Sequence, residues 1–283
     1  MSLIDQLETF TSESRVVDGA TLQFRRARSA GAGEAVSHVL LHGIGSASGS
    51  WLAQLLQVQR STAVASHVLA WDAPGYGAST PLAPAAPLAA DYAARLWQWL
   101  DALGPQADAP LTLVGHSLGA LMAAAAAAQA PARVARLVLL APAQGYARAD
   151  AALRSARLTD RLANLAALGP EGVARTRAPG MLSGAASAEQ VAFVAHVMAR
   201  IDPAGYTQAA RMLDGGDILA DLRTLACPIV VASGSADTIT PAPGCQALAA
   251  QVGASYLSLG AVGHSWPLEA AQQVNRLIGL DAP

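Results

Sequence analysis

A serine lies at the centre of a glycine-flanked pentapeptide, Gly115-His116-Ser117-Leu118-Gly119. Residues 111–114 before it are apolar and predict a buried strand, and residues 118–129 after it predict a helix. A G-x-S-x-G sequence between a strand and a helix is typical of a strained turn that exposes the serine hydroxyl at a helix N-terminus, which favours a developing anion. We therefore interpret Ser117 as a nucleophile rather than as an incidental serine in a glycine-rich turn.

A nucleophilic serine needs a base, and the base needs an acid that orients it. Two further predicted strands, residues 229–232 and 256–259, are each followed by a short loop, and these loops contain Asp237 and His264 respectively. Loops at the carboxyl ends of parallel strands share one edge of the sheet, so both side chains should reach Ser117. We expect His264 to be the base and Asp237 the acid. The alternative for Asp237 is a solvated residue of a turn, and the alternative for His264 is a histidine on a surface loop.

Acyl transfer also needs two N–H groups that stabilise the oxyanion. One should be the amide of Leu118, the residue after the nucleophile. The other should come from the loop His42-Gly43-Ile44-Gly45, and we favour the amide of Ile44. Gly43, Gly45 and Gly49 resemble a dinucleotide fingerprint only superficially, because Gly49 comes one position later than the last glycine of that fingerprint. We predict no cofactor and no metal.

The rest of the chain supplies the elements that would position these residues. Short apolar runs alternate with longer helical patterns, which predicts a mostly parallel, doubly wound α/β sheet with an N-terminal edge hairpin around residues 20–28. The expected strands are residues 36–41, 67–71, 111–114, 137–140, 229–232 and 256–259, and the expected helices are residues 50–59, 90–103, 118–129, 244–252 and 268–277.

Residues 144–225 break this alternation, because they show helical periodicity without a convincing strand. We predict a helical cap over residues 144–225, inserted after the sixth strand, and a core domain of residues 1–143 and 226–283. Arginines 154, 157, 161, 175 and 177 of the cap could bind a carboxylate or phosphate, or could form a solvated helix face. The candidate substrate contacts are His42, Gly43, Gln144, Tyr146, Met181, Met198, Tyr206, Met212 and Trp266.

Composition narrows the class of protein. Apolar residues make up 53% of the chain and charged residues 13%, which favours a globular enzyme over a disordered protein. The formal charge of −2 gives no basic excess for nucleic acid, and no apolar run approaches the length of a membrane span. Cys227 and Cys245 lack metal-ligand spacing. We expect a cytoplasmic monomer or homodimer that acts on a small molecule.

Five segments together resemble the α/β-hydrolase superfamily. They are His42-Gly43, Asp72-Ala73-Pro74-Gly75-Tyr76-Gly77-Ala78-Ser79, the serine pentapeptide, Gly234-Ser235-Ala236-Asp237 and Gly263-His264. The resemblance covers nearly the whole chain in the family's order, and it implies the fold, a helical cap and hydrolysis through an acyl-enzyme. Glu269 also matches a common family position, where it would anchor the last helix.

These segments define the superfamily better than they define the subfamily. Serine at position 117 disfavours haloalkane dehalogenases and epoxide hydrolases, which place aspartate there, and the loop at Gly43 differs from the HGGG loop of hormone-sensitive lipase-like esterases. We predict a carboxylic ester hydrolase acting on a small or medium ester, thioester or lactone, and the segments are equally compatible with enol-lactonases and small carboxylesterases. A C–C bond hydrolase of meta-ring-fission products, similar in size and in Trp266, is the alternative enzyme. A catalytically silent binding protein is the alternative from another class.

Overall fold

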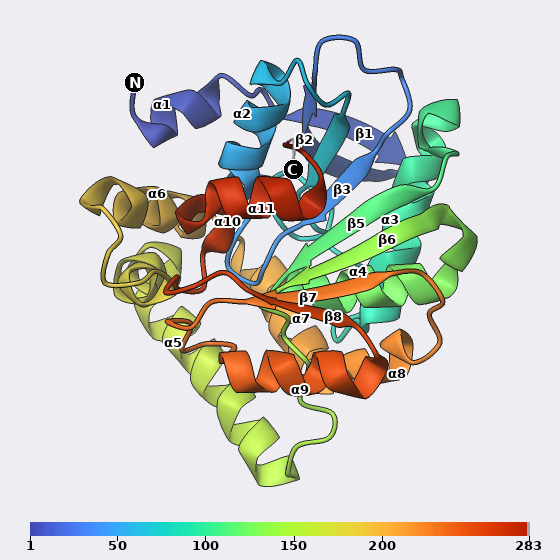
Figure 1. Cartoon of the computed structure of the whole chain (residues 1–283). Coiled ribbons are helices and arrows are strands. Elements are labelled where there is room, and N and C mark those ends of the chain that lie inside the picture. Colours follow the sequence, from blue (N-terminus) through green and yellow to red (C-terminus); the bar gives the residue numbers. More distant parts are fainter. Residues whose placement is uncertain (282–283) are drawn as a thin grey trace.

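A computed structural model describes residues 1–281, apart from the side chains of Pro105 and Trp266, and is built around one twisted sheet (Figure 1). The described strands form an eight-stranded sheet in the order β1-β2-β4-β3-β5-β6-β7-β8. Strand β2 pairs antiparallel with both β1 and β4, and the remaining pairs are parallel, which confirms the mostly parallel sheet with an N-terminal hairpin. The strands are β1 Glu13–Val17, β2 Ala20–Arg28, β3 His38–Leu41, β4 His67–Trp71, β5 Leu111–His116, β6 Val134–Leu140, β7 Ile229–Ser233 and β8 Ser255–Ser258.

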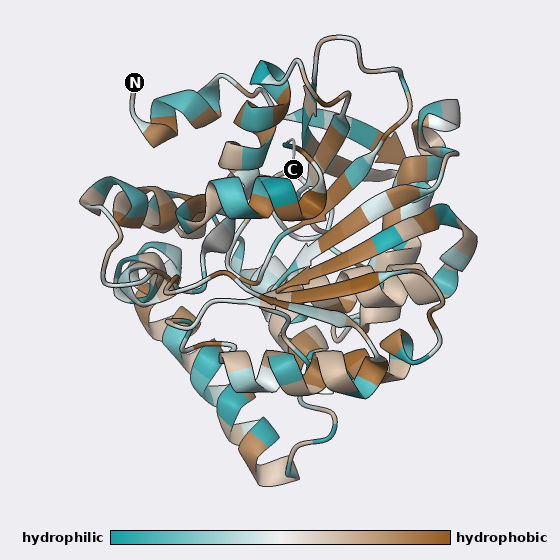
Figure 2. Ribbon diagram, in the orientation of Figure 1, coloured by the Kyte–Doolittle hydropathy of each residue, from teal (hydrophilic) through white to brown (hydrophobic). Residues whose placement is uncertain are grey.

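The central strands are buried on both faces, and successive residues enter different layers of the core. Along β6, Leu137 and Leu139 belong to one apolar cluster, whereas Val138 and Leu140 belong to the other. Apolar residues accordingly run along the strands without interruption by polar ones over most of their length (Figure 2). Because each buried leucine contributes roughly 2 kcal/mol on leaving water, this two-sided burial stabilises the sheet between its two helical layers.

Helices cover both faces of the sheet. Helices α2 and α11 contribute to the cluster that contains Leu140, and α3, α4 and α9 contribute to the cluster that contains Leu139. The predicted helix 268–277 is divided at Ala270, whose φ of −116° and ψ of 39° are not helical. The helices outside residues 144–225 are α1 Leu3–Glu8, η1 Ser48–Trp51, α2 Leu52–Arg60, α3 Ala89–Ala102, η2 Gly104–Ala107, α4 Leu118–Gln129, η3 Pro131–Arg133, α9 Ala242–Val252, α10 Trp266–Glu269 and α11 Ala271–Ile278.

The segment between β6 and β7 is helical throughout its regular structure, and its helices contribute to the apolar clusters on both faces of the sheet (Figure 1). Its first helix is broken at Gly169, where φ is 63°, and Pro170 begins the second half. A residue with positive φ followed by proline cannot continue an α-helix, so the chain changes direction there. The helices are α5 Ala151–Arg177, η4 Ala178–Met181, α6 Ala188–Met198, α7 Pro203–Gly215 and α8 Ile218–Leu222. No helix among residues 1–281 combines the length and the apolar character needed to cross a membrane.

His38 makes the stability of the fold depend on pH. It is buried at the start of β3, with Nε2 2.8 Å from the carbonyl oxygen of Ile278, and burial lowers its pKa to about 4. Between pH 6.5 and pH 4 the unfolded chain therefore binds more protons at this residue than the folded chain does. Stability falls as the pH falls through that window, and we expect His38 alone to remove about 3 kcal/mol.

Thermal unfolding measured from pH 7 to pH 4 tests this expectation. The midpoint should fall with pH in the wild type, and His38→Gln, which keeps a hydrogen-bond donor but does not titrate, should give a shallower slope. Burial also lowers the pKa of His116, to about 3, so the midpoint of the variant should still fall somewhat with pH. Equal slopes for the two proteins would contradict the assignment to His38.

Candidate active site

The serine turn is strained and leaves no room for larger residues in place of its glycines. Ser117 lies between β5 and α4 with φ at 52°, a conformation that costs a non-glycine residue energy and needs support from its surroundings. A Cβ added to Gly119 would strike the carbonyl of Leu41, and one added to Gly115 would strike backbone atoms of Gly119 and Ala120. The pentapeptide therefore allows α4 to begin directly against β3, with Ser117 at its N-terminus.

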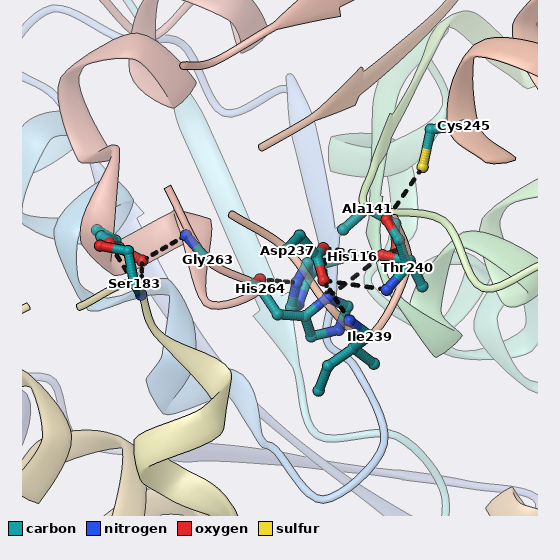
Figure 3. A network of polar contacts seen from close by, with 10 residues as sticks. His116, Ala141, Ser183, Asp237, Ile239, Thr240, Cys245, Gly263 and His264 are labelled. Atoms are coloured by element: carbon teal, nitrogen blue, oxygen red, sulfur yellow. Dashed lines mark hydrogen bonds and ion pairs between the residues drawn. The ribbon is translucent and has the colours of Figure 1, made fainter. Parts of the chain in front are cut away.

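His264 and Asp237 meet behind this turn. The Nδ1 atom of His264 lies 2.8 Å from Oδ2 of Asp237, and both side chains are almost completely buried (Figure 3). The second carboxylate oxygen, Oδ1, accepts hydrogen bonds from the amides of Ile239 at 2.8 Å and Thr240 at 3.0 Å. Burial raises the pKa of Asp237, but its hydrogen bond and electrostatic interaction with His264 and the hydrogen bonds from the amides of Thr240 and Ile239 outweigh it, so the pKa lies below its ordinary value. An ionised Asp237 accepts Nδ1–H, which leaves Nε2 of His264 as an acceptor.

Ser117 and His264 line the same cavity of about 250 Å³. Among the described residues, the hydroxyl of Ser117 makes no hydrogen bond to the imidazole of His264. Catalytic hydrogen bonds are often long in unliganded sites and shorten when substrate is bound. The arrangement brings together a serine hydroxyl, an imidazole with a free nitrogen and an ionised carboxylate.

Two backbone amides are available beside Ser117. Within the described part of the chain, the N–H groups of Ile44 and Leu118 donate no hydrogen bond to another protein group. The loop that contains Ile44 is held from two sides, because Gly45 N–H donates to Tyr76 Oη at 3.4 Å and His42 Nδ1 lies 2.8 Å from the carbonyl oxygen of Gly43. Unpaired amides on a fixed loop and at a helix start are suited to bind an oxyanion.

The cavity opens between the carboxyl ends of the strands and the helical segment 144–225. Residues that follow β3, β5, β6, β7 and β8 form its floor, and α5, α6 and α7 supply its opposite wall. Six of the candidate substrate contacts lie on it, namely Gly43, Gln144, Tyr146, Met181, Met198 and Tyr206.

Two other candidates do not reach the cavity. His42 is buried behind the loop, where its Nε2 accepts the amide hydrogen of Ala73 at 3.1 Å, and burial lowers its pKa. Met212 is fully buried in the core cluster beneath α7. Both are therefore packing residues, and the expectation of substrate contact is corrected for them. The side chain of Trp266 lies outside the described residues.

The five arginines of the helical segment separate into different environments. Arg157, Arg161 and Arg177 line the cavity. Arg154 instead forms an ion pair with Asp214 at 2.8 Å, and Arg175 is exposed away from the cavity.

Sequence reasoning missed the way in which the loop of His264 is attached to the helical segment. The amides of His264 and Ser265 both donate to the carbonyl oxygen of Met181, at 2.8 and 2.7 Å. The carboxylate of Glu269 accepts the amide of Gly263 at 2.9 Å and that of Ser183 at 3.1 Å (Figure 3). Glu269 thus joins the loop of His264 to the segment after η4, rather than only anchoring the last helix. No local signal in the sequence marks this contact.

Glu269→Gln should lower both stability and catalytic efficiency. One amide acceptor is lost and an NH₂ group faces a backbone N–H, so we expect a loss of about 1–3 kcal/mol in the free energy of unfolding. We also expect kcat to fall about tenfold as the loop of His264 loosens, with KM less affected. Chemical denaturation and steady-state kinetics measure these two effects. Glu189→Gln, at an exposed glutamate of α6 that also accepts a backbone amide, that of Leu3 at 2.8 Å, is the matched control for kcat. Unchanged kcat would contradict a positioning role for Glu269.

Comparisons with known proteins agree with this geometry. Residues 39–277 match the family model described as "Alpha/beta hydrolase family". A protein of Variovorax paradoxus, whose name marks it as an inferred carbamate hydrolase, is 34% identical over 216 residues, which cover 74% of this chain and 76% of that protein. An (E)-2-((N-methylformamido)methylene)succinate hydrolase of Acinetobacter baylyi is 34% identical over 110 residues, 38% of each chain.

Solved structures show the same fold at lower sequence identity. The enol-lactonase of Burkholderia xenovorans superposes with a TM-score of 0.79 at 22% identity, covering 94% of this chain and 98% of the enol-lactonase. An esterase of Thermogutta terrifontis gives a TM-score of 0.78 at 21% identity, covering 95% and 97%.

Proposed function

We propose that this chain, which belongs to the α/β-hydrolase family, is a serine hydrolase that cleaves a small or medium carboxylic ester, thioester or lactone. Ser117 is the nucleophile, His264 the base and Asp237 the acid that orients it. The amides of Ile44 and Leu118 form the oxyanion hole. Residues 144–225 act as a cap over the core domain of residues 1–143 and 226–283.

The reaction follows from the groups at the cavity. Nε2 of His264 removes the hydroxyl proton of Ser117 as Oγ attacks the substrate carbonyl, and the two amides stabilise the tetrahedral oxyanion. His264 then protonates the leaving oxygen or sulfur, which departs and leaves an acyl-enzyme. A water molecule, deprotonated by the same imidazole, attacks the acyl-enzyme and releases the acid and Ser117. Asp237 stabilises the imidazolium in both halves of the reaction.

The observation that carries this proposal is the 2.8 Å contact of His264 with Asp237 beside a cavity that also contains the strained Ser117. An elbow serine alone would fit a binding protein. A buried, ionised carboxylate fixed by two amides and directed at Nδ1 is the arrangement that orients a histidine for proton transfer, which supports the hydrolase over a binding protein.

Initial rates on p-nitrophenyl esters of increasing acyl length test the proposal, with reaction of Ser117 with a fluorophosphonate probe as a second measurement. We expect turnover with a preferred acyl length and covalent labelling at Ser117. Labelling without ester turnover would redirect the assignment to C–C cleavage of a vinylogous diketone. Absence of both, in folded protein, would favour the silent binding protein.

A second candidate reaction is hydrolysis of a carbamate. It is favoured by the Variovorax relative, which is named for that reaction and aligns with three quarters of this chain. The same nucleophile and oxyanion donors would serve, with a carbamoyl-enzyme in place of the acyl-enzyme. Rates on a p-nitrophenyl carbamate and on the ester of matched size separate the two, since a carbamate hydrolase should turn over the carbamate repeatedly rather than stop after one acylation.

A further inference from the structure

Three guanidinium groups face the cavity from helix α5, and no carboxylate among the described lining residues balances them. Arg157, Arg161 and Arg177 lie on the cavity wall, and the described lining residues include no aspartate or glutamate. Asp237 is separated from this wall by the imidazole that it orients. The cap wall of a largely apolar cavity is thus positively charged.

Two neighbouring arginines have a structural role, because each forms an ion pair with an aspartate. Arg154 pairs with Asp214 at 2.8 Å, and Arg148 pairs with Asp217 at 2.8 Å. None of the three cavity arginines forms an ion pair with a described residue. The segment therefore contains carboxylates that pair with arginines, but none of those described lines the cavity.

Tyrosine hydroxyls hold two of the three guanidinium groups in place. Arg157 Nη1 donates to Tyr146 Oη at 3.0 Å, and its Cζ lies 4.9 Å from the centre of that ring. Arg161 Nη1 donates to Tyr206 Oη at 3.2 Å. A guanidinium carries five N–H donors, so these single bonds orient the groups and leave most donors free. Neutral hydroxyls do not neutralise the charges.

Arg177 is the least satisfied of the three. It is half-buried, and its guanidinium forms no hydrogen bond with any described residue. Burial is the main cause that lowers its pKa; Arg161 lowers it as well, whereas Tyr206 and Tyr146 raise it. Arg161 and Arg177 line the same cavity, so their like charges repel each other there. Two half-buried groups of like charge without a counter-ion cost free energy, and a bound anion would offset that cost.

We propose that Arg157, Arg161 and Arg177 bind a carboxylate carried by the substrate at a position remote from the bond that is cleaved. This inference rests on the proposed hydrolase function and names its substrate class, which is a carboxylate-bearing ester, thioester or lactone. The planar fork of a guanidinium matches the two oxygens of a carboxylate, and a cavity of about 250 Å³ suits a small anionic acid rather than a nucleotide-sized carrier. Binding there positions the carbonyl over Ser117 and releases the repulsion between Arg161 and Arg177.

Two matched substrate pairs test the proposal. The first compares the mono-p-nitrophenyl ester of suberic acid with p-nitrophenyl octanoate, which puts the carboxylate on the acyl part. The second compares 4-acetoxybenzoate with phenyl acetate, which puts it on the leaving group. We expect a higher kcat/KM for the anionic member of at least one pair in the wild type.

Arg161→Gln and Arg177→Gln should each lower kcat/KM for that anionic substrate by about tenfold to a hundredfold, the usual loss for a charged hydrogen bond. The neutral partner should change less than about threefold. Arg161→Lys should keep part of the preference, because it keeps the charge but not the fork. Arg175→Gln is the matched control, since it removes an exposed arginine of the same helix end. Equal losses on neutral and anionic substrates, or a preference for neutral substrates in both pairs, would overturn the proposal.

Direct binding separates failure of this inference from failure of the proposed hydrolysis. Suberate should bind Ser117→Ala in a calorimeter, and binding should weaken about tenfold or more in the double variant with Arg161→Gln. If no ester is turned over but suberate still binds through Arg161, the anion site stands and the hydrolase assignment fails. If esters are turned over but neither suberate nor the anionic substrates depend on the arginines, the anion site is wrong and the hydrolase assignment stands.

Discussion

Ser117→Ala should lower kcat for ester hydrolysis by about 10³ to 10⁶-fold, because the only hydroxyl at the strained turn is removed while the amides of Ile44 and Leu118 remain. The residual rate would come from the oxyanion hole and from substrate binding. KM should change little, since Oγ of Ser117 makes no hydrogen bond with any residue that the structure describes. Steady-state kinetics on the preferred p-nitrophenyl ester give both values.

The fold should survive this substitution, because alanine fits where serine does and bears the same strain at positive φ. The thermal midpoint should stay within a few degrees of the wild type. Ser235→Ala, an exposed serine two positions before Asp237, is the matched control and should retain both turnover and fluorophosphonate labelling. Wild-type turnover by Ser117→Ala would remove Ser117 from the mechanism.

Asp237→Asn should lower kcat by about 10⁴-fold, because it stabilises the wrong tautomer of His264. Oδ1 of Asp237 accepts two backbone amides, from Ile239 and Thr240, so the asparagine must keep its carbonyl oxygen there. Its NH₂ group then occupies the place of Oδ2 and donates to Nδ1 of His264. The imidazole proton moves to Nε2, which can no longer accept the proton of Ser117.

A matched change separates this effect from a general loosening of the site. Thr240→Val removes the hydroxyl that donates to Oδ2 of Asp237 at 2.9 Å but leaves the carboxylate, so we expect less than a tenfold loss in kcat. The ¹⁵N chemical shifts of the His264 ring report the tautomer in both variants. Turnover within tenfold of the wild type for Asp237→Asn would contradict the orienting role.

Much of the fold could be predicted because its signals are local. Parallel strands covered on both faces read as continuous apolar runs, and β4 and α4 have the predicted bounds. Strand β5 extends beyond the prediction to His116, since Gly115 and His116 still pair with Leu139 and Leu140 of β6. Such ends depend on the neighbouring strand, which the local sequence does not contain.

The positions of Ser117, Asp237 and His264 were also predictable, because each follows a recognisable strand. Chain order and the parallel sheet then bring the three loops to one edge. The hydrogen bond of His264 to Asp237 agrees with that expectation, although the roles of the three residues await the experiments above.

The residues that line the cavity could not be predicted in the same way. Met198 and Met212 are both apolar residues on helices, yet one lines the cavity and the other is buried in the core. Arg157 and Arg175 are both exposed arginines of α5, yet only Arg157 lines the cavity. Helical periodicity assigns residues to a face, but which face meets the cavity depends on how the helix packs.

By itself, the sequence determined the order of strands and helices and the loops in which a nucleophile, an acid and a base could meet, because these depend on neighbouring residues and on the symmetry of a parallel sheet. Only the tertiary structure decided that Met181 binds the loop of His264 and that Ser183 binds Glu269. It also decided that Arg161 and Arg177 share a wall on which no described residue carries a carboxylate. Those contacts join residues far apart in the chain, and their energies exist only after the helical segment has packed against the sheet.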